Sequence, residues 1–442
     1  MGRSLAAMIA DMEEMFHSSC RRATMKNNEA IDLTSRERLL AAWTGKGYDH
    51  PPLTAWCFGF RAPPHLRWKN KGRDVRFWYS MRMEHIHTLP EPWELEDDLR
   101  RAQAWQSIGL DDVLDISVPW GLDPAVTWKD SLLPASGEEA YPVLVREYET
   151  PSGRLRHAVR KTGEDPGEGW VIQPDFVPLF EDFNIPRGLE HAVRGSEQVP
   201  IIRHLYQEPG PAQREDFLGR MERVSAFARR QGVAVQAWSA FGMDAVVWLM
   251  GVEGAIYLAM DRPEAFAELF RTVTRADAGR TELAAANPGV DLLVERGWYS
   301  STDLWSPQIL DRHLFPHIAE LSSIAHRYGK RFAYVMTTGV EALGGRLIEA
   351  GVDVLCFVDP VQDALTVERA RELLGGRMTL AGGINSTTFG SLSRQELKRQ
   401  VHRAMDALAG TGRFILQPVD ALHPDTSWAG FEAVIEAWKE CF

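Results

Sequence analysis

The stretch FAYVMTTGVEALGGRLIEAGVDVLCFVDP, residues 332–360, decides the fold. It holds two short runs rich in apolar and β-branched residues, FAYVM (332–336) and VDVLCFV (352–358), separated by a segment with apolar residues at helical spacing. A strand, a helix and a second strand in this order are typical of a parallel βαβ unit. We therefore expect a parallel sheet flanked by helices.

The same alternation extends from this unit in both directions. Amphipathic segments lie between most of the strand candidates, and several end on a glycine just before the next strand. Eight parallel strands suggest closure, so we predict an α/β fold of the (β/α)8 TIM-barrel type. The eight strand candidates are PLTAWCF (52–58), DVLDIS (112–117), GVAVQAW (232–238), DLLVE (291–295), FAYVM (332–336), VDVLCFV (352–358), RMTLAGG (377–383) and FILQPV (414–419).

Two segments fall outside this alternation. Residues 1–33 are predicted to form an N-terminal helical extension, and residues 34–442 the barrel, whose first helix starts at the capping-box-like Thr34-Ser-Arg-Glu and stops at Gly45. Residues 119–215 contain PVLVREYETPSGRLRHAVRKTG, a strand, turn and strand pattern with its turn at Pro151-Ser-Gly153. We expect a β-hairpin insertion after the second strand, near the barrel mouth.

Composition and charge exclude several classes of protein. The 49 Lys and Arg residues against 61 Asp and Glu give a net charge of −12, which argues against nucleic acid and anionic membranes as partners. The four cysteines are far apart and form no C-x-x-C pair, and neither a membrane-spanning apolar stretch nor a clean signal peptide can be found. We expect a cytoplasmic enzyme with a small-molecule substrate and no tightly bound metal or cofactor.

The candidate site follows from the expected barrel, in which catalytic groups come from the carboxyl ends of the strands. Glu295 ends an apolar strand, where burial raises the pKa of a carboxyl group toward the range useful for proton transfer; a salt bridge with Arg296 or Arg61 is the alternative. Arg61 and Asp359 complete the candidate catalytic set, although Asp359 precedes a proline and is equally suited to capping a turn. The candidate substrate-binding residues are Trp56, Phe58, Ser117, Trp238, Trp298, Tyr299, Thr337, Thr338, Asn385, Gln417 and His423.

Four further patterns carry weaker signals. The aromatic run ERGWYSSTDLWSP (295–307) suits a pocket for a planar ligand or a packed loop. The Gly-Gly turn of LAGGIN (380–385) is able to present N–H groups to an anion. His313 and His317 have helical spacing but lack the glutamate of a zinc motif, and Cys356 lies in an apolar strand, so we expect no metal site at these residues.

Several segments, in order, resemble the uroporphyrinogen decarboxylase superfamily, and the resemblance extends over residues 34–440. It implies a barrel fold, a homodimer, and one of two chemistries: removal of carboxylates from a tetrapyrrole, or methyl transfer with a corrinoid protein or a thiol as partner. The segments that carry the resemblance are SRERLLAAWTGKGYDHPPL (35–53), TDLWSPQILDRHLFPHI (302–318), GVDVLCFVDP (351–360), LAGGIN (380–385) and GRFILQPV (412–419).

Neither residue pattern of that superfamily is intact in this chain. The decarboxylases carry an arginine-rich segment after the first strand, of which this chain retains Arg61 and Arg67 at most. The thiol methyltransferases carry an H-x-C-G zinc motif after the fifth strand, and the matching stretch here is Met336-Thr-Thr-Gly339. We therefore expect this zinc site to be absent, with Thr337 and Thr338 binding a ligand or capping the turn.

Three hypotheses of function remain. The first is a methyltransferase-branch enzyme that demethylates a small O- or N-methylated compound and passes the methyl group to a corrinoid protein. The second is a cofactor-free decarboxylase of a carboxylated small molecule or tetrapyrrole, with Arg61 holding the carboxylate and Glu295 or Asp359 handling the proton. The third is a non-catalytic barrel that binds a tetrapyrrole or corrinoid.

Overall fold

The architecture was obtained as a computed structural model. It describes residues 32–70, 72–75, 77–78, 95–161, 177, 179–180, 187–363 and 365–442. The predicted N-terminal extension therefore lies, apart from residues 32–33, outside the described residues.

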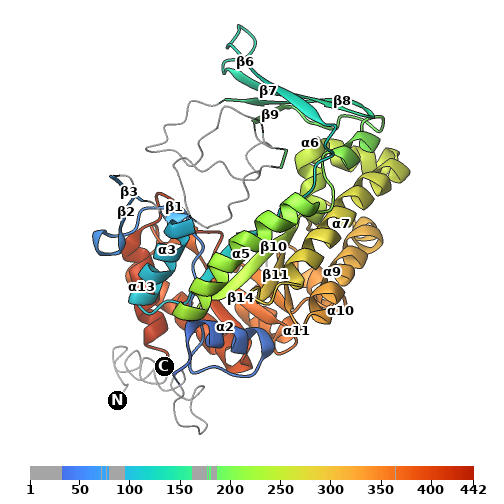
Figure 1. Ribbon diagram of the computed structural model, residues 1–442. Coiled ribbons are helices and arrows are strands. Elements are labelled where there is room, and N and C mark those ends of the chain that lie inside the picture. The colour runs from blue at the N-terminus through green and yellow to red at the C-terminus, as the bar shows by residue number, and fades with distance from the viewer. Residues whose placement is uncertain are drawn as a thin grey trace, which may run out of the picture.

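A parallel, curled sheet of seven strands forms the centre of the molecule, with helices packed around it (Figure 1). Its strands run in the order β15-β14-β13-β12-β11-β10-β5, so that neighbours in space are neighbours along the chain, apart from the long insertion between β5 and β10. The second to eighth strands predicted from the sequence correspond to the seven strands of this sheet. Their bounds are β5 Val113–Ser117, β10 Ala234–Ala240, β11 Leu292–Arg296, β12 Arg331–Val335, β13 Val354–Val358, β14 Thr379–Asn385 and β15 Phe414–Val419.

The first predicted strand, residues 52–58, is not a regular strand. It makes two isolated parallel bridges, Leu53 to Leu416 and Cys57 to Leu422, and the Leu53 carbonyl accepts a hydrogen bond from the Asp111 N–H at 2.9 Å. Proline at positions 51 and 52 removes two backbone donors, which prevents a continuous ladder at its start. These residues lie beside both edge strands of the sheet, and the chain then enters a short antiparallel pair, β1 (Phe58–Phe60) with β4 (Phe77–Trp78).

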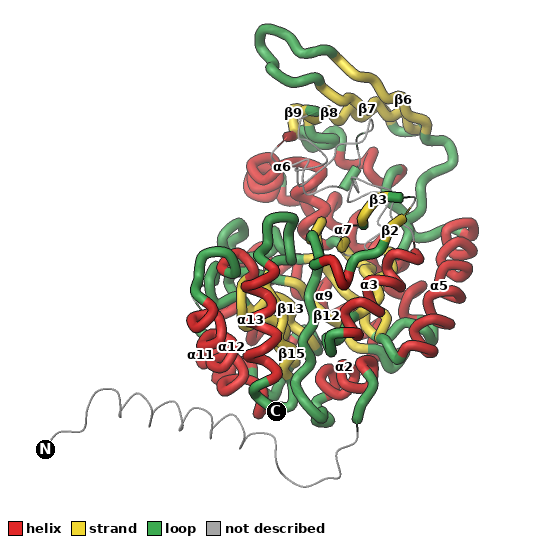
Figure 2. The backbone as a smooth tube through the Cα atoms, turned by 90° about the vertical axis from the view of Figure 1, so that its left-hand side faces the viewer, coloured by secondary structure: helices red, strands yellow, loops and turns green. Residues whose placement is uncertain are grey.

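The helices form the outer layer around the sheet (Figure 2). The first described helix begins and ends as predicted: Thr34 and Glu37 form a capping box, and Gly45 adopts a left-handed conformation at the C-cap. The α-helices are α2 Ser35–Thr44, α3 Leu95–Ser107, α5 Pro211–Gln231, α6 Gly242–Asp261, α7 Pro263–Ala285, α8 Pro307–Ile309, α9 Phe315–Arg327, α10 Val340–Glu349, α11 Val367–Leu374, α12 Arg394–Leu408 and α13 Trp428–Lys439. The shorter turns are η1 Pro64–Leu66, η2 Val199–His204, the π-helical η3 Leu310–Leu314, η4 Ser386–Thr388 and η5 Ala409–Thr411.

A second, antiparallel sheet follows β5 and stands apart from the central sheet in Figure 2. Its strands are β6 Thr127–Leu133, β7 Val143–Thr150, β8 Gly153–Arg160 and β9 Gly188–Glu190, in that spatial order. β7 and β8 pair across a tight turn in the register Thr150 to Gly153. A two-residue antiparallel pair, β2 (Lys69–Asn70) with β3 (Arg73–Asp74), lies earlier in the chain.

One helix among the described residues, α6, is long and apolar enough to cross a membrane. Most of its apolar window is buried inside the protein, and its backbone is broken at Gly251. A core helix passes the same test of length and composition, so this is weak evidence for a membrane span.

The Gly-Gly pair of LAGGIN does not form a turn, which corrects the expectation of an anion-binding loop there. Gly382 and Gly383 lie inside β14, both with positive φ. A Cβ atom on Gly382 would lie 2.4 Å from the carbonyl oxygen of Val358, where the register of β13 shifts. Glycine is therefore required here for the close approach of two strands.

Replacing Gly382 by alanine should destabilise the protein by about 3 kcal/mol, because the new methyl group meets backbone atoms that cannot move aside. The measurement is the free energy of unfolding in urea. The matched control is Gly345→Ala in α10, where a Cβ meets nothing within 4 Å and alanine should stabilise the helix by about 0.5–1 kcal/mol. Equal effects of the two substitutions would contradict this account.

Candidate active site

A buried carboxylate lies on the inner face of the curled sheet. Asp115 is in the middle of β5, and its Oδ1 accepts hydrogen bonds from Gln236 Nε2 and from Trp238 Nε1, the latter at 2.9 Å. The parallel register places Gln236 directly beside Asp115. Sequence reasoning that looked only at strand ends missed Asp115 and Gln236, although a charged residue inside the apolar run DVLDIS was an available signal.

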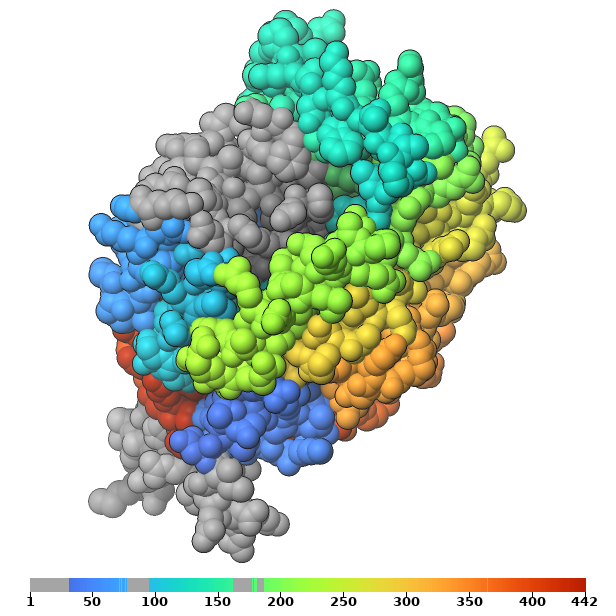
Figure 3. All heavy atoms as spheres, viewed as in Figure 1, coloured from blue at the N-terminus to red at the C-terminus, as the bar shows by residue number. Residues whose placement is uncertain are grey.

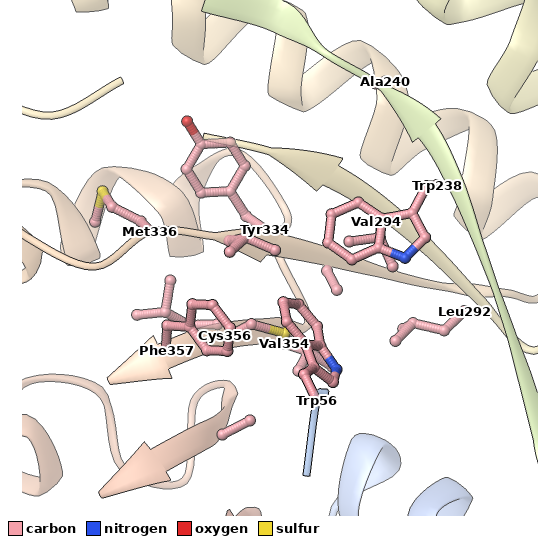
Figure 4. Packing of buried hydrophobic residues seen from close by; sticks show 14 of the residues in the cluster. Trp56, Trp238, Ala240, Leu292, Val294, Tyr334, Met336, Val354, Cys356 and Phe357 are labelled. Carbon is pink, nitrogen blue, oxygen red and sulfur yellow. The ribbon is translucent and has the colours of Figure 1, made fainter. Parts of the chain in front are cut away.

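Four aromatic side chains, one of which is the Trp238 that donates to Asp115, lie close together. The ring centroid of Trp56 lies 5.3 Å from that of Trp238, 6.3 Å from Trp298 and 4.4 Å from Phe357. Trp238 and Trp298 are parallel, with centroids 6.1 Å apart. Figure 4 shows Trp56, Trp238 and Phe357 converging from three separate segments. We call these four residues the aromatic cluster; three of them were predicted from the sequence.

Phe357, the fourth member, was not predicted. It lies inside β13 at φ 71°, where the pairing with β14 shifts register. A positive φ is costly for a residue with a bulky side chain, and such strain is concentrated at functional sites. The irregular backbone brings Phe357 beside Trp56, which the regular alternation of a strand would not have indicated.

A cation borders the aromatic cluster. The guanidinium of Arg296 lies over the ring of Trp298, 4.1 Å from its centroid, and its Nε is 3.7 Å from the Asp244 carboxylate. Asp244 also accepts the backbone N–H groups of Trp298 and Tyr299, at 3.2 and 3.0 Å. Asp244 therefore fixes both the loop that carries Trp298 and the cation that covers it.

Glu295 does not face the aromatic cluster. Leu292 and Val294 point toward the interior in Figure 4, and Glu295 projects from the opposite face of β11, toward the helices. It is fully buried, its Oε1 lies 3.4 Å from His317 Nε2 in α9, and it packs against Gly242. Glu295 therefore lies on the helix side of the sheet, and its catalytic role stays a prediction.

The ion partner of Glu295 is His317, where the sequence suggested Arg296 or Arg61. Burial raises the pKa of Glu295, and its interaction with His317 opposes part of this shift. Burial lowers the pKa of His317, but the nearby Glu295 and Asp277 carboxylates outweigh it and leave that pKa raised. His313 instead packs against the rings of Phe266 and Phe270. In the part of the chain that the structure describes, no group of three or more His, Cys, Asp or Glu residues could hold a metal ion.

Asp359 and Asn385, also predicted, contact each other at the ends of β13 and β14. Asn385 Nδ2 donates to Asp359 at 2.9 Å, and the Asp359 carboxylate accepts the N–H of Val361 at 2.8 Å. Burial raises the pKa of Asp359 despite these hydrogen bonds. The pair stabilises two adjacent turns, which agrees with the capping alternative.

The remaining predicted residues are dispersed. Ser117 accepts a hydrogen bond from Arg220 at 3.2 Å, Thr338 donates to Ser301 at 3.2 Å, and Arg61 is exposed. Gln417 is buried in β15, and Thr337 is half-buried after β12. The ring centroid of Phe58 in β1 lies 6.3 Å from that of His423. The backbone carbonyl of Tyr299 accepts the indole N–H of Trp305. Of the predicted set, only Trp56, Trp238 and Trp298 are brought together at the aromatic cluster.

Residues 232–441 match the model of the uroporphyrinogen decarboxylase (URO-D) family. This confirms the family resemblance predicted from the sequence, and it covers the chain from the start of β10 to α13. The resemblance of residues 34–231 to the same superfamily stays a prediction.

One of two similar solved structures agrees with this fold. A methyltransferase from Methanosarcina mazei is similar with a TM-score of 0.52 and 15% sequence identity, over 92% of this chain and 99% of that one. A 3-keto-D-glucoside 4-epimerase from E. coli has 13% identity over 57% of this chain and 96% of its own, but its TM-score of 0.29 supports no inference. No curated protein sequence matches the chain significantly. The first structure supports the fold alone, and the family match suggests an enzyme.

The Glu295–His317 pair should make stability depend on pH. The pKa of His317 is raised in the folded state. The stability that the charged His317 adds to the folded protein is therefore fully present below its ordinary pKa of 6.5, and it is lost as pH rises through the folded pKa. In Glu295→Gln this partner charge is removed while the shape is kept. The difference in unfolding free energy between wild type and variant should therefore shrink from pH 6 to pH 9.

Urea denaturation at each pH provides this measurement. The control is Glu282→Gln in α7, because Glu282 pairs with Arg327 at the surface, where a salt bridge contributes little. A difference that stays constant over this pH range would show that His317 holds no additional proton in the folded protein.

Proposed function

We propose that this protein is a methyltransferase-branch enzyme that demethylates a small O- or N-methylated compound and passes the methyl group to a corrinoid protein. The URO-D family match and the similarity in fold to a methyltransferase support this branch broadly. The proposal includes closure of the barrel by residues 52–58, which carry Trp56. The substrate then binds inside the sheet, against the aromatic cluster.

The aromatic cluster is the observation that carries the proposal. Its rings provide an apolar wall that excludes water and suits a methylated ring or a methylated nitrogen. The arginines expected to hold a polycarboxylate do not gather there: Arg61 is exposed, and Arg67 donates to the carbonyl of Ala62 at 2.5 Å. This arrangement favours methyl transfer over the decarboxylation of a tetrapyrrole, which needs several cations around its carboxylates.

In the proposed reaction, the bond from the methyl carbon to the substrate oxygen or nitrogen breaks and its electron pair stays on that heteroatom. The heteroatom then takes up a proton, and Asp115 is the interior group suited to hold and deliver it. Gln236 and Trp238 fix the orientation of Asp115 by donating to its Oδ1. The corrinoid supplies the nucleophile that accepts the methyl group and is carried by the partner protein, outside the chain's own residues.

Zinc–thiol chemistry does not fit the described residues. The stretch Met336-Thr-Thr-Gly339 lacks both ligands of the family's zinc motif. Cys356 is buried in β13, and burial raises the pKa of its thiol to about 12, so it stays protonated at neutral pH. No step is assigned to a bound zinc ion.

Demethylation should require an added corrinoid. The test incubates the purified protein with a series of methoxy-aromatic compounds and N-methyl amines, with and without reduced cobalamin as the methyl acceptor. We expect demethylated product, measured by mass spectrometry, together with the spectral change of methylated cobalamin. Turnover without the cobalamin, or release of CO2 from a carboxylic acid, would refute the proposal. A tetrapyrrole that copurifies with an inactive protein would support the non-catalytic hypothesis instead.

Truncating the aromatic cluster should reduce this activity. In Trp298→Leu, kcat/KM should fall roughly tenfold or more, because the substrate loses a ring that faces Trp238. The control is Trp428→Leu, since Trp428 is also half-buried but packs against Phe60 and Phe431. If both variants lose activity equally, the aromatic cluster is not the substrate site.

A further inference from the structure

Three polar side chains of the insertion after β5 form a chain of hydrogen bonds. Ser152 Oγ lies 2.7 Å from His204 Nε2, and His204 Nδ1 lies 2.7 Å from Asp123 Oδ2. Ser152 is in the turn between β7 and β8, His204 ends η2, and Asp123 lies in the loop between β5 and β6. A hydroxyl, an imidazole and a carboxylate linked in this order are the arrangement by which serine hydrolases activate a nucleophile. We call these three residues the surface triad.

The backbone places Asp123 beside His204. The N–H of Asp123 donates to the carbonyl oxygen of His204 at 2.9 Å, and Gly121 exchanges two backbone hydrogen bonds with Gln207, at 2.8 and 3.0 Å. A Cβ atom on Gly121 would clash with the carbonyl oxygen of Glu208, so glycine is required for this close approach. Two segments that are far apart in the sequence therefore hold the imidazole and the carboxylate together through main-chain contacts.

A tight turn brings Ser152 to the imidazole. The turn packs against η2, because a Cβ atom on Gly153, which has a φ of 138°, would lie 3.1 Å from Ile201 Cδ1. The N–H of Ser152 donates to Thr150 Oγ1 at 3.2 Å, which fixes the backbone of the turn. Ser152 itself is exposed, and Figure 3 shows the atoms of its sheet, coloured blue-green, at the surface at the top of the molecule. A small molecule in solution therefore reaches the hydroxyl group.

The hydrogen bonds select one tautomer of His204. Asp123 accepts the N–H of Ala125 at 2.9 Å, and this bond together with the contact to His204 lowers the pKa of the Asp123 carboxyl group. An ionised carboxylate only accepts, so the Nδ1–H of His204 donates to it. Nε2 then accepts, and both the Ser152 hydroxyl and the Arg203 Nε–H, the latter at 3.4 Å, donate to it. This tautomer is the one that takes a proton from a serine.

A cation lies beside the serine. Nη2 of Arg203 donates to Ser152 Oγ at 2.9 Å. Its positive charge favours negative charge on Oγ, and it lies within reach of an oxygen bonded to the carbon that Oγ attacks, as the donors of an oxyanion hole do. Arg203 and Ser152 are both exposed, so water weakens this electrostatic effect. The arrangement therefore suits substrates that have a good leaving group.

We propose that the surface triad is a second reactive site of this protein, which cleaves activated oxygen esters and thioesters of small carboxylic acids. Ser152 Oγ attacks the carbonyl carbon while its proton passes to His204 Nε2. The bond from that carbon to the leaving oxygen or sulfur breaks, the leaving group takes the proton from Nε2, and the acyl group stays on Ser152. A water molecule that gives its proton to His204 then releases the carboxylic acid, and His204 returns the proton to Ser152. Ser152 and His204 are the catalytic residues, and Asp123 is a positioning residue that orients the imidazole.

The reaction of the full-length protein with p-nitrophenyl acetate tests the site. We expect a burst of p-nitrophenol and an acetyl group on Ser152, located by mass spectrometry of the tryptic peptides, and a fluorophosphonate should modify the same residue irreversibly. Ser152→Ala should lose the burst, whereas Ser136→Ala, a change at an exposed serine of the loop between β6 and β7, should keep it. The modified residue is identified in the wild-type protein, so this result does not depend on how a variant folds. An unmodified Ser152, or a burst that Ser152→Ala leaves unchanged, would overturn the proposal.

The role of Asp123 is tested by the rate of acylation. In Asp123→Asn the side-chain amide no longer selects the required tautomer of His204, so the acylation rate constant should fall roughly a hundredfold or more while the KM for p-nitrophenyl acetate stays as in wild type. Asp123→Glu keeps the carboxylate and should recover part of the rate. If Asp123→Asn acylates as fast as wild type, or if Asp123→Glu is as slow as Asp123→Asn, Asp123 only supports its loop and the assigned role is wrong.

Discussion

The buried carboxylate of Asp277 is the group on which the surrounding structure most depends. It accepts the backbone N–H groups of Phe241 and Gly242 at the start of α6, and it also binds Tyr206 and Arg280. Through these contacts the turn after β10, the segment after η2 and helix α7 are held together. An unpaired charge at this depth would be strongly destabilising, so these groups must be ordered together.

The contacts of Asp277 lie on the helix side of the central sheet. Arg280 donates to the carbonyl oxygens of Val118 and Trp238, which fixes the ends of β5 and β10 from the helix side. Glu295 and His317 belong to the same side of the sheet, next to Asp277. The inner face is left to the aromatic cluster and to Asp115. The Glu295–His317 and Asp277–Arg280 pairs thus lie on the outer face of the sheet, whereas the aromatic cluster, bordered by Arg296 and Asp244, lies on its inner face.

Much of the fold could be predicted because helices and strands leave periodic patterns in the sequence. The strands from DVLDIS to FILQPV and the capping box at Thr34 are such patterns, and both agree with the structure. Residues 52–58 were assigned as a regular strand because an apolar run does not reveal how many ladder hydrogen bonds will form. The Gly-Gly pair of LAGGIN was assigned to a turn, because a sequence does not reveal whether glycines serve a turn or the close approach of two strands. In the structure they serve the close approach of β13 and β14. The candidate site was predicted in part: Trp56, Trp238 and Trp298 converge, while Phe357 depended on an irregular backbone.

The sequence by itself indicated an α/β fold with a parallel sheet, a family resemblance that residues 232–441 confirm, and the aromatic residues Trp56, Trp238 and Trp298. Only the tertiary structure decided which side of each strand faces the interior. Successive residues of a strand point to opposite faces, but a parallel strand buried on both faces is apolar throughout, so its pattern does not distinguish inside from outside. For this reason the sequence alone does not tell that Glu295 faces the helices, whereas the structure places Asp115, held by Gln236 and Trp238, on the face of the sheet that carries the aromatic cluster.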